Sequence, residues 1–215
     1  MITYFSKEVK EAESWKRLQE NIEDWERHKE APLMSFDQIP IILKSGEFVT
    51  LTVGHDESGK TYFCFEDCIV DRWHMNSEWT NEGGWAASDM RRWLNTTLFA
   101  LLPDEIQAVI KPTKIVQVIG GERIETEDKI FLFSKTQLFG KGSWSEIEPE
   151  DTQIDIFRTE KNRVKECGNL GASRWWTRSP RSDNSINFCM VYSGGSAYNG
   201  NARSSRGVAP GFCIT

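Results

Sequence analysis

RWWTRSP at residues 174–180 and GVAPGFCI at residues 207–214 enclose the segment that guides our interpretation of this chain. Ser, Asn, Arg, Gly and Tyr make up most of the residues from Arg174 to Arg206. Disordered segments lack aromatic and apolar runs, but this segment contains FCMVY at residues 188–192. Tyr and Trp supply rigid contact area in a paratope, while Ser, Gly and Asn supply adaptable hydrogen bonds. Residues 174–206 are therefore predicted to form a ligand face on a packed frame.

The chain carries a formal net charge of -6 at pH 7, which argues against general nucleic-acid binding. Charge is unevenly distributed, because the charged residues after Glu166 are Asp183 and five arginines. The C-terminal segment from residue 174 onward, called the tail below, is therefore predicted to present a mildly basic face. Arg suits planar and bidentate contacts, so these side chains either contact a ligand or pair with carboxylates of the frame.

Targeting signals and disulfides are not indicated by the sequence. Residues 1–30 are heavily charged and lack the apolar segment of a signal peptide. No apolar run is long enough to span a bilayer. Five cysteines at irregular spacing do not describe a disulfide framework. We expect cytoplasmic synthesis with reduced thiols and no membrane partner, and release within a phage particle stays open.

Short strands and helices alternate along the chain without a βαβ pattern, which predicts an α+β fold. Residues 36–69 read as an antiparallel hairpin, and Ser88 is a good N-cap for a helix at residues 89–100. No linker divides residues 36–215, so we expect a single domain there. The other expected elements are helices at residues 103–110 and 157–167, strands at 114–118, 129–133, 186–192 and 208–214, and a tight turn at 193–196.

Residues 1–32 are predicted to form an amphipathic N-terminal helix outside this domain. Its apolar residues recur at spacings of three and four, namely Val9, Ala12, Trp15, Leu18, Ile22 and Trp25. Such a helix either packs on its own domain or acts as a docking or oligomerisation element, because a two-Trp stripe flanked by charge resembles a short coiled-coil seam.

Four motifs in order resemble an uncharacterised bacterial domain family that is common in gut Firmicutes and their mobile elements. They are SDMRRWLN at residues 88–95, DKIFLFS at 128–134, WWTRSP at 175–180 and GVAPGF at 207–212. The resemblance covers residues 36–214, and the chain departs from the usual motifs at Thr177 and Ala209. That family is similar to the C-type-lectin-like fold of formylglycine-generating enzymes and of variable proteins of diversity-generating retroelements. The resemblance implies this fold, with short antiparallel strands and two or more helices, and a diversified ligand face in the tail.

The sequence gives little support for an enzyme active site or for a metal site. His28, His55 and His74 are scattered, and Cys64 and Cys68 lack the partners of a zinc site. The tail offers a single carboxylate, whereas calcium needs several oxygen ligands. We therefore expect no catalytic residue, no metal and no cofactor. The remaining enzymatic hypothesis is an oxidase like the formylglycine-generating enzymes, which use a cysteine pair, here Cys189 and Cys213.

Our main hypothesis is a non-enzymatic protein that binds a protein or glycan through the tail. The alternatives are a structural or assembly subunit of a phage or mobile-element particle, which forms a homo-oligomer through the N-terminal helix, and the oxidase. The polar tail residues are either ligand contacts or an inert solvated loop. Alternation along the tail strands assigns Trp176, Phe188, Met190, Val208 and Phe212 to the core. The predicted ligand residues are Trp175, Arg178, Asn184, Asn187, Tyr192, Ser193, Ser196, Tyr198, Asn199, Asn201, Arg203, Ser204 and Arg206.

Overall fold

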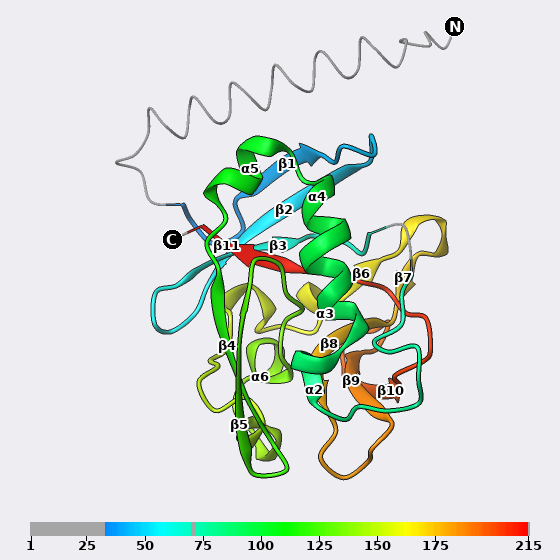
Figure 1. Cartoon of the computed structure of the whole chain (residues 1–215). Helices are drawn as coiled ribbons and strands as arrows, with labels where there is room; N and C mark the ends of the chain where they lie inside the picture. Colours follow the sequence, from blue (N-terminus) through cyan, green and yellow to red (C-terminus); the bar gives the residue numbers. More distant parts are fainter. Residues whose placement is uncertain (1–32, 70–71, 215) are drawn as a thin grey trace, which may run out of the picture.

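The computed structural model describes residues 33–69 and 72–214 (Figure 1). Strands account for 34% and helices for 22% of the structure, and the strands form several small antiparallel sheets. The expected α+β class with a C-type-lectin-like arrangement of two or more helices is therefore wrong, and the structure is mostly β. The predicted N-terminal helix lies outside the described residues. Within the described ranges, no helix is both long and apolar enough to cross a membrane.

The largest sheet has the strand order β1-β2-β3-β11 and joins the two ends of the described chain. Its β-branched and aromatic residues favour extended backbone, and the predicted hairpin at residues 36–69 is confirmed. The final strand is shorter than expected, and its Phe212 ring stacks on Phe63 with centroids 5.5 Å apart. The four strands are β1 (Gln38–Ile42), β2 (Phe48–His55), β3 (Thr61–Phe65) and β11 (Gly211–Cys213).

One helix of more than two turns lies in the described part of the chain, at residues 89–101 (Figure 1). The Ser88 side chain caps its first turn by accepting a bond from Arg91 N, as predicted. Met90, Leu94 and Leu98 are buried on one face of this helix. Its three consecutive parts are α3 (Asp89–Trp93), the π-helical η1 (Leu94–Leu98) and α4 (Phe99–Leu101). The short helices α2 (Gly84–Ala87) and α5 (Asp104–Val109) flank it.

The hairpin of β4 (Thr113–Ile119) and β5 (Glu122–Asp128) corrects the predicted strand at residues 129–133. Gly120 and Gly121 have φ angles of 60° and 86°, which a two-residue hairpin turn requires. That turn returns the chain immediately, so the charged segment after it pairs with β4. Residues 130–133 are buried in the core instead, where Phe131 bridges to Gly211.

The tail forms a three-stranded sheet of order β10-β9-β8. Its strands are β8 (Trp175–Pro180), β9 (Asn187–Val191) and β10 (Ala197–Asn201). The predicted turn at residues 193–196 joins β9 to β10, and Gly195 adopts a φ of 89° there. β8 and β10 were not predicted as strands. All five residues that it assigned to the core are buried.

Short elements connect the two larger sheets. The helix α6 (Lys135–Phe139) begins with a capping box formed by Ser134 and Gln137. The expected helix at residues 157–167 is replaced by brief 3-10 turns and a two-strand ribbon, because the backbone of Val164 is extended. The remaining elements are η2 (Ser143–Glu146), η3 (Asp155–Phe157), η4 (Lys161–Arg163), η5 (Gly168–Leu170), β6 (Lys165–Glu166) and β7 (Ala172–Ser173).

Candidate functional site

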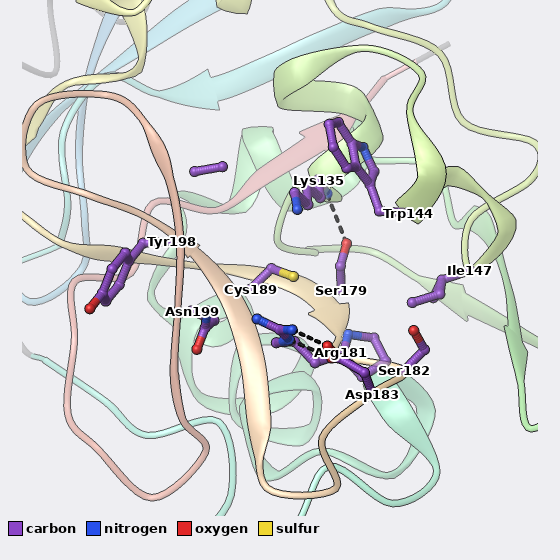
Figure 2. A pocket seen from close by; sticks show the side chains of 12 residues that line it. Lys135, Trp144, Ile147, Ser179, Arg181, Ser182, Asp183, Cys189, Tyr198 and Asn199 are labelled. Atoms are coloured by element: carbon purple, nitrogen blue, oxygen red, sulfur yellow. Dashed lines mark hydrogen bonds and ion pairs between the residues drawn. The ribbon is translucent and has the colours of Figure 1, made fainter.

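A pocket of about 390 Å³, called the tail pocket below, opens between the tail sheet and the segment around α6. Residues 179–183, Cys189 and residues 197–199 line it from the tail. Lys135, Trp144 and Ile147 complete its wall from outside the tail. Figure 2 shows Lys135 and Trp144 on one side of Cys189 and the Arg181–Asp183 pair on the other.

The α6 side of the pocket presents a fixed cation. The capping box orients the first turn of α6, in which Lys135 N donates a 2.8 Å hydrogen bond to Ser179 Oγ. Lys135 Nζ lies 4.1 Å from the centroid of the Trp144 ring, a cation–π contact that holds the ammonium group in place. Trp144 Nε1 donates in turn to the Gly140 carbonyl. This wall therefore offers a positive charge whose position is set by neighbouring side chains.

The opposite wall is the loop at residues 181–187, which the buried side chain of Asn81 organises. Asn81 Nδ2 lies 3.0, 2.8 and 2.7 Å from the carbonyl oxygens of Arg181, Asn184 and Asn187. Arg181 Nε donates a 2.6 Å bond to Asp183 Oδ1. One amide thus ties three points of the loop together, and the loop presents an ion pair to the pocket.

The pocket floor carries a thiol that is neutral at ordinary pH. Burial raises the pKa of Cys189 to about 11, although the charge of Lys135 opposes this. The thiolate is the reactive form of cysteine, so Cys189 is a poor nucleophile. Behind the floor, burial raises the pKa of Glu148 to about 7, and Gln117 Nε2 donates to its Oε1 at 2.9 Å. The pocket therefore offers hydrogen bonds and charges rather than an activated nucleophile.

Two predicted ligand residues belong to the frame. Trp175 is 0% exposed, and its Nε1 donates to the Arg163 carbonyl at 2.9 Å. Arg178 is 1% exposed; it donates to the Leu132 carbonyl and forms an ion pair with Asp151. Both side chains are enclosed by protein, which corrects the prediction that they contact a ligand.

The other predicted ligand residues lie at least partly on the surface and form separate groups. Tyr198 and Asn199 line the tail pocket, and Asn187 Nδ2 donates to Asn199 Oδ1. Tyr192 lies apart, against the Tyr198 ring. The rest are distributed as follows: Asn184 in the loop at 181–187, Ser193 and Ser196 in the β9–β10 turn, Asn201, Arg203 and Ser204 in the turn after β10, and Arg206 against Trp73.

Strand alternation separates these residues onto two faces of the tail sheet. Directly paired residues point to the same side, and neighbours along a strand point to opposite sides. Cys189 pairs with Asn199, and both line the tail pocket. Tyr198 pairs with Met190 on the other face, and in Figure 2 its ring points away from Arg181 and Asp183. The face that the sequence predicted as continuous is therefore divided.

A family model described as a domain of unknown function (DUF6273) matches residues 58–215, which is most of the chain. The chain belongs to the DUF6273 family. The matched segment includes every residue of the tail pocket. No curated protein and no solved structure matches the chain.

Most residues of the DUF6273 pocket were missed from the sequence. Lys135 could have been placed from the spacing of Ser134 and Gln137, which predicts the start of a helix. Lys135 follows Ser134 and therefore lies in the first turn of that helix. Asp183 was noticed as the one acid of the tail, without its partner Arg181. Trp144 and Ile147 follow a loop and carry no pattern that connects them with the tail.

Proposed function

We propose that this DUF6273 protein is a non-enzymatic recognition protein whose tail binds an extended peptide segment of a protein ligand. The observation that carries this proposal is the open edge of β10 beside the tail pocket. β10 is the outermost strand of the tail sheet and pairs with β9 alone among the described strands. An extended peptide can add to such an edge through main-chain hydrogen bonds, with its side chains entering adjacent pockets.

The backbone polarity of β10 follows from its hairpin. Tyr192 N donates to Ser196 O, and Ala202 N donates to Ile186 O. Hydrogen-bonded pairs alternate along an antiparallel ladder, so the even-numbered residues between these bonds face β9. The main-chain groups of Ala197 and Asn199 then point to the open edge, while their side chains line the pocket. An added strand would therefore run directly past the tail pocket.

The pocket walls suit a polar side chain from such a strand. Lys135 offers an ammonium group, Arg181 and Asp183 offer both charges, and Asn199 offers an amide. Buried polar groups need partners, so a ligand side chain that carries a carboxylate or an amide fits better than an apolar one. Adaptable polar groups beside a tyrosine are typical of protein-binding surfaces.

The oxidase alternative has less support. Cys189 lies on β9 of the tail sheet and Cys213 on β11 of the largest sheet, and burial raises the pKa of both thiols. The assembly-subunit alternative depends on the N-terminal helix, which lies outside the described residues. It stays a prediction.

The test is selection of a phage-displayed library of random peptides on the immobilised full chain. Dissociation constants of selected peptides are then measured by fluorescence anisotropy for wild type and for Ala197→Pro. Proline at this outward position leaves the β9–β10 ladder in place and blocks an incoming strand. We expect Ala197→Pro to weaken binding by about tenfold or more, since at least one hydrogen bond and its geometry are lost.

Gln38→Pro is the matched control, because it places a second outward-facing proline on β1, an edge strand that already contains Pro40. It should leave peptide binding unchanged. Arg181→Gln tests the pocket and should weaken those peptides that carry a carboxylate. Equal binding to wild type and Ala197→Pro would contradict the edge-strand mode. Failure to select any peptide, together with binding of a glycan panel to the same chain, would replace the protein ligand with a sugar.

A further inference from the structure

Three arginines lie on three extended segments that run side by side at the edge of the tail sheet. Trp73 and Arg206 exchange backbone hydrogen bonds of 3.1 Å in both directions. Gly207 N donates to Arg174 O at 2.9 Å, and Gly207 bridges to Trp175. The segments containing Arg72, Arg174 and Arg206, the arginine cluster below, are thus held together by the main chain.

Two exposed tyrosines border this cluster. The Arg174 guanidinium lies 4.5 Å from the Tyr192 ring centroid and 5.4 Å from that of Tyr198. The two rings are 5.5 Å apart, with exposures of 37% and 51%. Cation–π contacts with both rings, whose planes are inclined by 58°, restrain the position of the guanidinium group. Tyr192 and Tyr198 therefore act as a rigid support for Arg174.

In the described part of the chain, the cluster has none of the carboxylates that neutralise other arginines of this protein. Arg91, Arg123 and Arg181 each form an ion pair with Asp or Glu. Among the described residues, no member of the cluster does so. Arg72 Nη2 donates to Ser173 Oγ at 3.0 Å, and Arg206 Nη1 donates to the Ser205 carbonyl at 2.9 Å. Within the described ranges, the three positive charges of the cluster are therefore not paired with a carboxylate.

The side chain of Arg206 gives the strongest indication that this cluster binds a ligand. Its Nε is buried and makes no hydrogen bond among the described residues. Burial lowers the pKa of Arg206, and the charges of Arg174 and Arg72 lower it further. A buried donor without an acceptor and a group of like charges both destabilise a fold. An anionic ligand would relieve both effects, because it would accept a hydrogen bond from Arg206 Nε and would reduce the repulsion among the arginines.

We propose that the arginine cluster binds an oxyanion, namely a phosphate or a sulfate, either as a free ion or as the monoester group of a larger ligand. Planar guanidinium groups donate paired hydrogen bonds to such oxygens. Tyr192 and Tyr198 lie beside the anion and contact whatever the ester carries. Alternation along β9 and β10 places these tyrosines on the face opposite Cys189 and Asn199. The arginines of the anion site are absent from the lining of the tail pocket, and the two sites share Tyr198. The anion proposal does not depend on the peptide-binding proposal.

The experiment measures thermal unfolding and calorimetric titration of the full chain at constant ionic strength, with chloride as the balancing anion. The probes are inorganic phosphate, inorganic sulfate, phosphoserine and glucosamine 6-sulfate. We expect phosphate or sulfate to raise the melting temperature of wild type in a saturable manner, since a ligand that binds only the folded state stabilises it. Tighter binding of an esterified probe than of its free ion identifies a larger ligand, and equal binding identifies the free ion.

Arg174→Gln and Arg206→Gln remove single members of the cluster, and Arg123→Gln is the control. Arg123 is an exposed arginine of β5, which belongs to the β4-β5 hairpin and not to the tail sheet. We expect each cluster variant to weaken anion binding about tenfold or more, because each removes charge-assisted hydrogen bonds. The control should bind as wild type does.

A second readout separates a binding role from a structural one. Without added phosphate or sulfate, Arg206→Gln should melt at or above the temperature of wild type, because the substitution removes a buried charge that Arg174 and Arg72 repel. If Arg206→Gln instead melts lower and the anions stabilise it as much as wild type, the cluster is structural and the proposal is wrong. The proposal is equally wrong if neither phosphate nor sulfate stabilises wild type more than chloride does.

Discussion

At the scale of single residues, Gly207 is a position where the fold leaves no room for a side chain. A Cβ atom there would lie 2.4 Å from Cys68 Sγ, 2.5 Å from Cys167 Sγ and 3.1 Å from Arg174 O. Both thiols are buried, so neither can withdraw into solvent. We expect Gly207→Ala to lower the free energy of unfolding by about 1–3 kcal/mol, as other overpacked sites do. Urea unfolding followed by fluorescence measures this change.

Gly194→Ala is the matched control for Gly207→Ala. Gly194 lies in the β9–β10 turn, and a Cβ atom there would meet nothing within 4 Å. Adding Cys68→Ala to Gly207→Ala should recover part of the lost stability, because it removes one of the two clashing sulfurs. Equal stability of Gly207→Ala and Gly194→Ala would show that the thiols move aside without cost.

At the scale of elements, the shape of the tail pocket depends on how Asn81 holds the loop at residues 181–187. A carboxylate cannot donate to the three carbonyls that the Asn81 amide contacts. We therefore expect Asn81→Asp to lower the free energy of unfolding by roughly 3 kcal/mol, since a buried charge would face unpaired acceptors. Hydrogen exchange of the loop amides, measured by mass spectrometry, should accelerate in parallel.

Asn184→Asp provides the same chemical change at an exposed position of that loop. Asn184 Oδ1 accepts a 3.0 Å bond from Ile186 N, and a carboxylate oxygen can accept it equally well. This variant should be as stable as wild type. If Asn81→Asp and Asn184→Asp unfold alike, Asn81 does not organise the loop.

Some elements of this fold could be predicted from the sequence, and others could not. The hairpin of β2 and β3 and the Ser88 cap were predictable, because local composition and turn residues determine them. The pairing of β4 with β5 was not predictable, because the sequence of β5 is rich in charged residues, which are not typical of a strand. Only the Gly120–Gly121 turn indicates that β5 pairs with β4. Burial of Arg178 was equally hidden, since its partner Asp151 lies in a distant loop. Local patterns predicted elements, whereas long-range pairing decided which tail residues reach the surface.

At the scale of the whole molecule, Glu148 links stability to pH. Burial raises its pKa from 4.5 to about 7 in the folded state. Between these values the folded protein keeps a proton that the unfolded chain has released, so stability falls as the pH rises through this range. The loss is on the order of 3 kcal/mol, because each pKa unit corresponds to about 1.4 kcal/mol. Glu148→Gln should gain stability relative to wild type as the pH rises from 5 to 8.

Urea unfolding at several pH values measures this difference, with Glu150→Gln as the control. Glu150 is half exposed and lies two residues from Glu148. The difference in unfolding free energy between Glu150→Gln and wild type should stay nearly constant with pH. A Glu148→Gln profile parallel to that of wild type would show that Glu148 titrates normally.

The pairing of β11 with β3 also affects how the protein folds during its synthesis. Phe212 lies opposite Phe63 in the sheet, although roughly 150 residues of chain separate them. Ribosomes add about 5–20 residues per second, so the free edge of β3 waits on the order of ten seconds for its neighbour during synthesis. An unpaired strand edge invites association with other chains. Nascent copies of this protein should therefore depend on chaperones until the last strand emerges, and contacts of such high sequence separation should make refolding slow.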